Sequence, residues 1–361
     1  PFAGGGAIPL EAARLGCKTY GNDINPVAHI IQKGSLEFPQ KYGKPINYTN
    51  AEFVKLYGEE TLKTIPNEWK TYTSGNATGV RMPNRLSFDV EFYAKKLLTE
   101  TENEIGHIYP ADQNGNKPIA YYWARIATCN NPSCKAEVPL LRGFSLCNKK
   151  DRKFFLKPSI EGNNISFEVV NRMVSDEGYN KRGNLKCPCC GSITDVKQIK
   201  EQNPSGKYKL KLLAIISEGD KGKTYRSPTN DEETFFSQQT TIRDIPNELM
   251  QKNSAGGDLL SWGITNWGQV FSNRQLSVLN TLTEKLAKLK QSFGFKNQYN
   301  HSIVTYLGIF IDRIAAMSTS FGLWKDNLEA VVTPFSRQAI PIVFDFPEVN
   351  IFSNSTGSAS N

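Results

Sequence analysis

The chain has 361 residues, of which 39% are hydrophobic, so it can form two domains or one domain with a large insertion. No apolar run approaches the roughly 18 residues that a membrane span requires, so we expect no transmembrane segment. The net charge of +8 at pH 7 favours a polyanionic partner such as a nucleic acid. The odd number of cysteines, seven, argues against secretion and predicts a cytoplasmic protein.

A glycine-rich turn opens the chain as "PFAGGGAIPLEAARLG". Gly4, Gly5 and Gly6 allow positive φ and let a ligand approach the backbone closely. Pro9 suits the first turn of a helix, and Gly16 suits its end. The strand that normally leads into such a turn does not precede it, so we expect the sequence to begin inside a longer chain.

The stretch 17–26 predicts a short strand that ends at Asp23, followed by a turn at Asn25-Pro26. A carboxylate about 20 residues beyond a glycine turn holds the ribose of a nucleoside in Rossmann-type folds. Pro9 occupies the place of the third glycine in the dinucleotide fingerprint, which disfavours NAD. S-adenosylmethionine (SAM) has a ribose and no phosphate, so it fits this turn better. The alternative is a glycine turn with a purely structural role.

The rest of the chain divides into three regions by its sequence pattern. Residues 1–117 continue an α/β pattern, with a loop-like stretch at 72–85 and an amphipathic helix expected at 88–109. Residues 118–230 are rich in predicted strands and contain the clustered cysteines. The alternation that starts at Tyr208 and then becomes fully apolar predicts one strand that enters a core.

Residues 231–361 are expected to be mostly helical. Ser272 and Gln275 have the spacing of a capping box, and leucines follow them at helical intervals. A second apolar helix is predicted at 302–317 and a strand at 339–346. The polar residues 353–361 predict a flexible tail or loop.

Two cysteine pairs carry the strongest chemical signal: Cys129-x4-Cys134 and Cys187-x2-Cys190. Zinc favours four ligands in a tetrahedron, and paired thiolates supply them. Cys190 is preferred to Cys189 because proline after the first cysteine and glycine after the second suit a tight turn. Such a site leaves no open coordination position, so its zinc would be structural. The alternatives are free thiols, or a disulfide in an oxidising compartment.

Basic stretches in the same region interleave Lys and Arg with aromatic residues. The segments 149–157, 197–202 and 207–211 could follow a nucleic-acid backbone while Phe154, Phe155 or Tyr208 stack on bases. Solvated strand faces with ordinary core aromatics are the alternative. We assign no site role to Cys17, Cys147, His29, His107 and His301, and expect structural roles for Asp312-Arg313 and Arg337-Gln338.

Several stretches resemble the adenine-specific DNA methylases that carry a zinc ribbon. They are "PFAGGGAIPLEA", "NDINPVA", "YYWARIATCNNPSC", "EVPLLRGFSL", "CPCCG", "WGQVFSNRQL", "TYLGIFIDRIA" and "FSRQAIPIVFDFPEVN". The resemblance implies that Phe2, Gly4, Gly6 and Asp23 bind SAM, with Gly5 part of the same turn. It also implies methyl transfer to adenine N6 in DNA, and it supports the four zinc ligands.

The expected fold is α/β: a partial, Rossmann-like SAM-dependent methyltransferase fold with a strand-rich zinc-ribbon insertion at 118–230. The family's Pro-Pro catalytic motif is absent from the chain. We therefore expect it beyond Asn361, name no catalytic residue, and expect this chain alone to be inactive. The alternatives are a zinc-ribbon nucleic-acid-binding module with a non-catalytic cofactor fold, and an RNA or protein methyltransferase.

Overall fold

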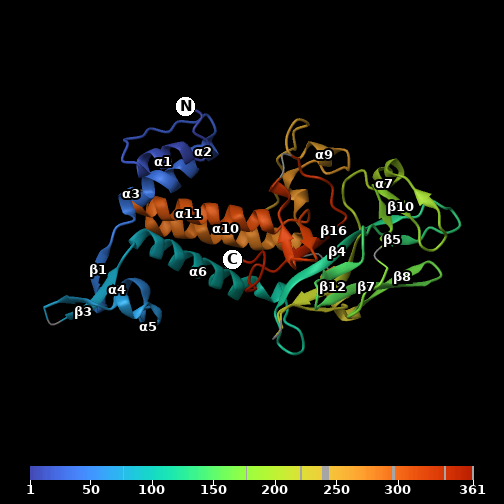
Figure 1. Cartoon of the computed structure of the whole chain (residues 1–361), viewed down its shortest axis with the longest axis horizontal. Helices are drawn as coiled ribbons and strands as arrows, with labels where there is room; N and C mark the ends of the chain where they lie inside the picture. The colour runs from blue at the N-terminus through green and yellow to red at the C-terminus, as the bar shows by residue number, and fades with distance from the viewer. Residues whose placement is uncertain are drawn as a thin grey trace. The chain divides into compact units, whose positions relative to one another are not determined.

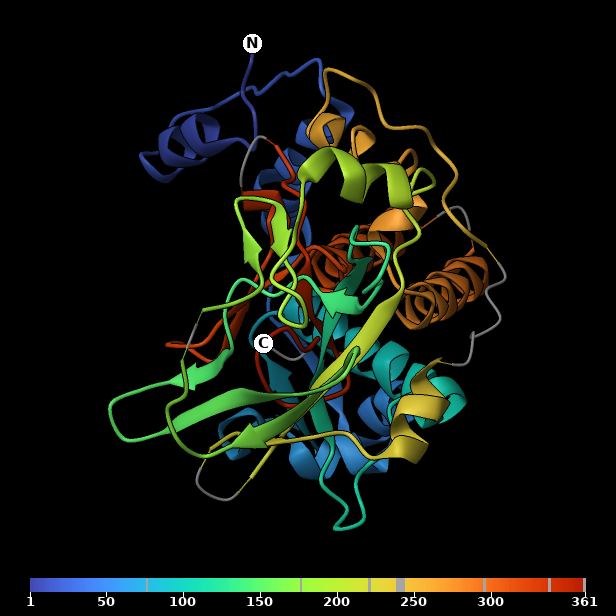
Figure 2. The ribbon, with the colours of Figure 1, turned by 90° about the vertical axis from the view of Figure 1, so that its right-hand side faces the viewer.

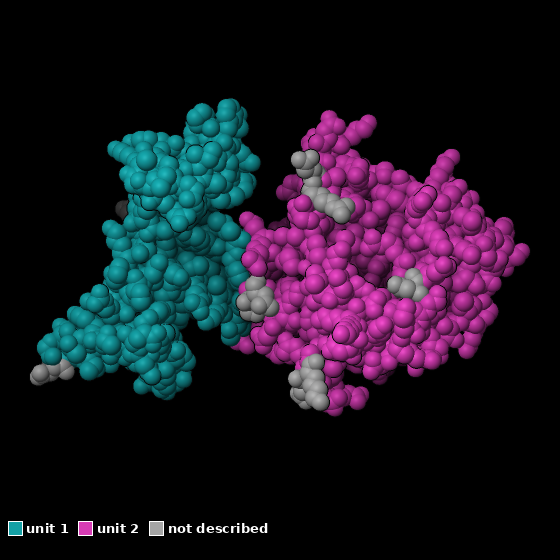
Figure 3. Space-filling model, viewed as in Figure 1, with its two compact units in different colours: residues 1–100, 282–311 teal, residues 101–281, 312–361 magenta. Residues whose placement is uncertain are grey.

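The computed structural model describes residues 1–75, 77–175, 177–219, 222–237, 244–294, 297–336 and 339–359. The chain divides into two compact units, one of residues 1–100 and 282–311 and the other of residues 101–281 and 312–361 (Figure 3). Each crossing between the units falls within a long helix. The division into three regions remains an interpretation of the sequence.

Short helices form the start of the first unit (Figure 1). They are α1 (Ala7–Arg14), α2 (Pro26–Gln32), a π-helical turn (Lys33–Glu37) and α3 (Phe38–Tyr42). Helix α1 ends as predicted, because Gly16 has φ +86° and its N–H donates to Ala13 O at 3.0 Å. Cys17 N–H donates to Ala12 O, which completes the glycine-dependent helix end.

The strand predicted to end at Asp23 is wrong, because residues 17–23 have no regular secondary structure and belong to no sheet. A strand needs a ladder of main-chain hydrogen bonds, and this stretch has one bond of that kind, from Ala3 N–H to Asn22 O. Asn25 does make the predicted turn. Its Oδ1 accepts from Val27 N–H at 2.9 Å and so caps α2, whose first residue is Pro26.

A small sheet follows in the first unit and corrects another expectation. Its elements are β1 (Ile46–Thr49), α4 (Asn50–Tyr57), α5 (Glu59–Thr64), β2 (Tyr72–Ser74) and β3 (Ala77–Met82). The stretch 72–85 is therefore not a loop but mainly a hairpin, in which β3 pairs with both β1 and β2. Val80 and Met82 are fully buried against Tyr48 and Phe53, and this burial stabilises the strand.

Three long helices contribute the second core of this unit: α6 (Arg85–Ile105), α10 (Asn273–Phe293) and α11 (Gln298–Met317). The predicted apolar face of α6 is confirmed, since Val90, Tyr93 and Leu97 pack with Ile303 and Leu307 of α11. The predicted capping box of α10 is also confirmed by its two reciprocal hydrogen bonds. None of the helices in the described chain is both long and apolar enough to span a membrane.

The main sheet of the second unit is built on β4 (Pro118–Thr128), which is buried along almost its whole length. Around it lie β5 (Glu137–Pro139), β12 (Leu210–Ser217), β13 (Thr224–Arg226) and β16 (Asp345–Val349), in the order β13-β12-β4-β16 with β5 also paired to β4. The strand predicted from Tyr208 is confirmed as β12. The strand predicted at 339–346 begins later, at Asp345.

Smaller elements complete the second unit (Figure 2). They are β6 (Ser145–Asn148), β7 (Lys153–Glu161), β8 (Asn164–Val170), β9 (Asn180–Lys181), β10 (Asn184–Lys186), β11 (Ile193–Thr194), α7 (Val196–Gln202), α8 (Asn230–Ser237), α9 (Gly257–Leu260), β14 (Leu323–Lys325) and β15 (Ala330–Val332). Single 3-10 turns occupy Asn67–Trp69, Gly106–Ile108, Trp267–Val270 and Pro334–Ser336.

The fold is therefore a mixture of helices and sheets, as expected. Every strand pair within the described chain is antiparallel, and a parallel sheet of Rossmann type is not among them. Residues 353–359 form a partly buried turn, which agrees with the loop, rather than the tail, predicted for the polar end. Ser353 and Ser358 are buried, and Ala359 N–H donates to Ile351 O at 3.0 Å.

Arg125 of β4 connects three distant segments. Its guanidinium donates to Val343 O at 2.6 Å and to Ser320 O and Oγ at 3.1 Å. The same group lies between the rings of Phe321 and Phe346, 4.6 and 4.8 Å from their centroids. Burial lowers the pKa of Arg125 to about 10, and the carbonyl groups compensate the lost hydration.

A buried ion pair joins α10 to β16. Arg274 Nη2 and Nε donate to the two oxygens of Glu348 at 2.6 and 2.8 Å, a bidentate contact. Both side chains are buried, and the Arg274 guanidinium lies 4.7 Å from the ring centroid of Phe236. Each charge therefore depends on the other for compensation.

We expect Glu348→Ala to lower the free energy of unfolding by about 3–5 kcal/mol, because Arg274 would remain charged and buried without a partner. The measurement is urea unfolding followed by circular dichroism. The double variant Glu348→Ala/Arg274→Met removes both charges and should recover part of the loss. A double variant less stable than the single one would contradict this account.

Candidate metal centre

The first pair of cysteines lies in the connection between β4 and β5. Cys129 follows the last residue of β4, and its N–H donates to Ala136 O at 2.9 Å. Cys134 N–H and Lys135 N–H both donate to Asn131 O at 3.0 Å. Lys135 has φ +49°, which reverses the chain after the second thiol. The four-residue spacer thus forms a compact turn.

The second pair lies at the tip of the hairpin of β10 and β11. Cys187 N–H donates to Ser192 O, and Gly191 N–H donates to Cys187 O, both at 2.9 Å. Gly191 has φ +77°, a conformation that favours glycine. This confirms the turn predicted from the glycine after Cys190.

Two asparagines, which the sequence analysis did not single out, connect the two turns. Asn130 N–H donates to Thr194 Oγ1 at 3.0 Å, and Asn130 Nδ2 donates to Ile193 O at 3.2 Å. Asn131 Nδ2 lies 3.4 Å from Ser192 Oγ. The only signal for these contacts in the sequence is that the two asparagines lie between the cysteines of the first pair, directly after Cys129.

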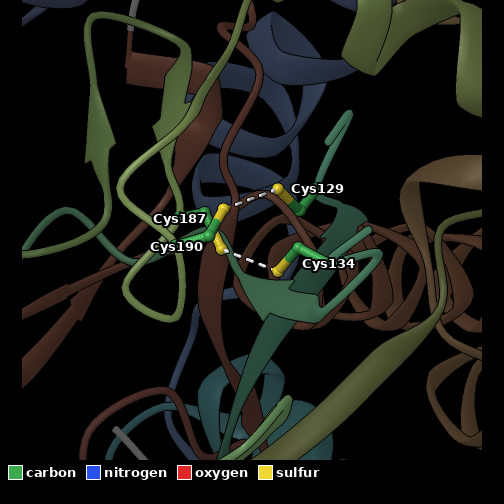
Figure 4. Close-up of side chains that lie close together, drawn as sticks. All are labelled: Cys129, Cys134, Cys187 and Cys190. Atoms are coloured by element: carbon green, nitrogen blue, oxygen red, sulfur yellow. Dashed lines mark hydrogen bonds between the residues drawn. The ribbon is translucent and has the colours of Figure 1, made fainter. Parts of the chain in front are cut away.

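The four predicted thiols face one another (Figure 4). All four Sγ atoms lie within 4.8 Å of one another, with 3.6 Å between Cys129 and Cys190 and 3.8 Å between Cys134 and Cys187. A tetrahedral zinc site with bonds of about 2.3 Å has sulfur–sulfur edges of about 3.8 Å, so the thiols fit this ion. A disulfide would need about 2.05 Å, and the cysteines are free.

The other cysteines lie outside this group, as expected. Cys189 is half-buried beside it, Cys17 is exposed, and the Cys147 thiol is buried with its Sγ 3.6 Å from Arg152 O. The structure therefore shows four cysteines that could together hold a metal ion. That the ion is zinc remains a proposal.

The surroundings shift the thiol pKa values in opposite directions. Burial raises the pKa of Cys129 to about 12, so this thiol keeps its proton at neutral pH when no metal is bound. Hydrogen bonds from the Ser192 side chain and main chain lower the pKa of Cys190 to about 6. Cys190 is also the exposed member of the group. A metal ion would thus meet one ready thiolate and displace the proton from Cys129.

The predicted cofactor residues gather at a second place, in the first unit. Gly4 N–H donates to Asp23 Oδ2 at 2.8 Å, and Asn25 N–H donates to Asp23 Oδ1 at 2.9 Å. The bonds from Asn25 and Gly4 lower the pKa of Asp23, so it is a carboxylate at neutral pH. The Asp23 carboxylate therefore contacts the glycine turn, although Gly4 lies 19 residues before it in the chain.

The three glycines differ in what surrounds them. Gly4 has φ +54°, and a Cβ there would meet no described atom within 4 Å. At Gly6, with φ +86°, a Cβ would lie 3.0 Å from Gln32 Cγ, so both the backbone conformation and the tight packing disfavour a larger residue. Gly5 has ordinary space beside Ile31. Phe2 is 84% exposed. Gly4 therefore presents bare backbone to solvent.

The three aromatic residues of the basic stretches differ in how far they are buried. Phe155 is fully buried and so is not available to stack on a base, whereas Tyr208 is half-buried with its hydroxyl covered. Phe154 is half-buried and stacks on Tyr225 at 4.9 Å between centroids. Arg337 and Gln338 lie outside the described residues, and the pairing of Asp312 with Arg313 remains a prediction.

Comparison with known proteins gives no family for this chain. No family model matches it, and neither a curated protein nor a solved structure does. The argument for its function therefore rests on its own residues and their geometry.

We expect the purified protein to carry one metal ion per chain, and Cys129→Ser, Cys134→Ser, Cys187→Ser or Cys190→Ser to lose it. Three thiolates and a hydroxyl make a poorer site, and the second unit should melt at a lower temperature. Elemental analysis and thermal unfolding measure these effects. Cys189→Ser is the matched control and should retain the ion. Full occupancy in Cys187→Ser would remove that residue from the ligand set.

Metal affinity should rise with pH between about 6 and 8, because ions displace protons from thiols whose pKa lies above that range. Each displaced proton changes the affinity by about tenfold per pH unit. Cys190 is already a thiolate there, so fewer than four protons are released. Competition with a chromophoric chelator measures the slope. An affinity independent of pH would show that the thiols are not the ligands.

Proposed function

We propose that this chain is part of a SAM-dependent DNA methyltransferase specific for adenine N6, with a structural zinc ribbon. The observation that supports it most directly is the hydrogen bond from Gly4 N–H to Asp23 Oδ2. A glycine turn joined to a carboxylate of the following segment is the arrangement that holds a nucleoside ribose in Rossmann-type folds.

The residues of the turn have capacity left for such a ligand. Main-chain N–H groups donate to both oxygens of Asp23, and each carboxylate oxygen can accept two bonds. The remaining lone pairs suit the two hydroxyls of a ribose. The bare backbone at Gly4 admits the rest of the ligand. Bound SAM would supply an electrophilic methyl group.

Exposed apolar side chains support the Rossmann-like part of the proposal. Ile8 and Leu10 of α1 and Val27, Ile30 and Ile31 of α2 are exposed. Helices of a doubly wound fold turn such faces toward a sheet. The parallel sheet itself and the cytoplasmic location remain predictions from the sequence.

The charge distribution supports a DNA partner. Residues 118–230 contain 20 Lys and Arg against 10 Asp and Glu, whereas the rest of the chain has 23 against 25. The whole positive surplus therefore belongs to the segment that holds the four thiols. A polyanion would be attracted to this segment rather than to the molecule as a whole.

The zinc in this proposal has no catalytic part. Four protein thiolates occupy all four coordination positions of a tetrahedral ion, so neither water nor substrate can bind to it. Its role is to hold the β4–β5 turn and the β10–β11 hairpin together.

We expect Asp23→Asn to weaken SAM binding roughly tenfold, because the hydrogen bonds from ribose hydroxyls would lose their charged acceptor. The amide can still accept one main-chain bond, so the turn should persist. Isothermal titration calorimetry with SAM and the complete chain measures the effect.

Glu11→Gln is the matched control, since this carboxylate is exposed on α1 and pairs with Arg14. It should bind SAM like the unchanged chain. Equal affinities for Asp23→Asn and Glu11→Gln would remove Asp23 from the site. Absence of any SAM binding together with an intact metal centre would favour the nucleic-acid-binding module instead.

A further inference from the structure

A buried carboxylate of the second unit gathers three cationic side chains from two other segments. Glu329, in the turn between β14 and β15, lies 2.5 Å from Lys149 Nζ and 3.4 Å from Arg152 Nη1. Lys223 Nζ donates to the main-chain oxygen of Glu329. Lys149 and Arg152 come from the β6–β7 turn, and Lys223 directly precedes β13.

The local backbone is shaped around this group. Glu329 has φ +51°, which is uncommon for a residue with a side chain, and its Oε1 accepts from Tyr225 OH at 2.8 Å. Arg152 Nη2 donates to Lys223 O. Gly222 has φ +104°, and a Cβ there would lie 2.6 Å from Arg152 Nη1. These contacts define the positions of the cations.

Charge in this group is unbalanced, and the surplus faces outward. One carboxylate meets three cations, so two positive charges remain without a carboxylate among these residues. The side chain of Glu329 is 4% exposed, whereas those of Lys149 and Arg152 are 36% and 24% exposed. Burial lowers the pKa of Lys223, although Glu329 raises it. An anion arriving from solvent would meet the cations first.

Aromatic rings flank the cations. Lys223 Nζ lies 5.4 Å from the ring centroid of Trp324, and Arg152 Cζ lies 5.8 Å from that of Phe154. Phe154 stacks on Tyr225. Rings keep water away from one side of the cations, and this strengthens their attraction for an anion.

We propose that Lys149, Arg152 and Lys223 bind a phosphodiester group of the DNA backbone. Glu329 holds these cations in position. The inference rests on the proposed DNA partner and names the residues that would contact the DNA backbone. A phosphodiester carries one negative charge and only acceptor oxygens, which match a site that has donors and a positive surplus.

The test is DNA binding by the complete chain, measured by fluorescence anisotropy with a labelled duplex between about 50 and 200 mM salt. Lys149→Ala should weaken binding several-fold and reduce the slope of log K against log salt by about 0.9, the value for one lost phosphate contact. Lys149→Arg keeps the charge and should keep the slope. Lys95→Ala, which removes an exposed cation of α6, is the control for net charge alone.

Thermal unfolding of each variant separates binding from structure. If the slope of log K against log salt stays unchanged in Lys149→Ala and Lys223→Ala, the inference is overturned, whether or not the melting temperature falls. The group would then have only a structural role. Equal loss of slope in Lys95→Ala would overturn it too, because general attraction would then explain the binding. The SAM titration decides the proposed cofactor site independently of these results.

Discussion

The second unit depends on the burial of one strand, β4. Two of its neighbours in the main sheet, β12 and β16, come from segments far apart in the chain, and Arg125 hydrogen-bonds two further segments near residues 320 and 343. A guanidinium placed between two rings and donating to carbonyl groups can remain buried only while all these segments are present. Because Cys129 directly follows β4, the position of the metal centre is set by the same strand.

The metal centre combines local order with a long-range link. Main-chain hydrogen bonds shape each turn, and Asn130 joins the two turns. Two of the four thiols come from each turn, and the pairs are more than 50 residues apart in the chain. An ion bound by all four would therefore close a long loop, so its binding free energy would contribute directly to the stability of this unit.

The second unit contains three buried charged groups, and each is compensated for its lost hydration in a different way. Arg274 has one carboxylate partner, and Arg125 has carbonyl groups and rings. Both are compensated within the protein and serve the fold. Glu329 instead lies beneath three cations, all of them partly exposed, and so leaves positive charge accessible to solvent. This difference in charge balance and exposure is the reason why we propose a binding role for this group alone.

The sequence by itself determined the features that depend on neighbouring residues. The helix end at Gly16, the capping box of Ser272 and Gln275, and the turn at Gly191 all involve bonds between residues a few positions apart, so spacing and residue type suffice. The spacing of the cysteines, together with the proline after Cys187 and the glycine after Cys190, was sufficient to choose the four that meet. Only the tertiary structure decided which extended segments are strands, because pairing depends on a partner: residues 17–23 have none among the described residues, whereas β3 has two. The tertiary structure also decided that Phe155 is buried rather than part of a surface. It likewise decided that Arg274 pairs with Glu348, 74 residues away in the chain. Contacts of this range depend on how the whole chain packs, and no local pattern encodes them.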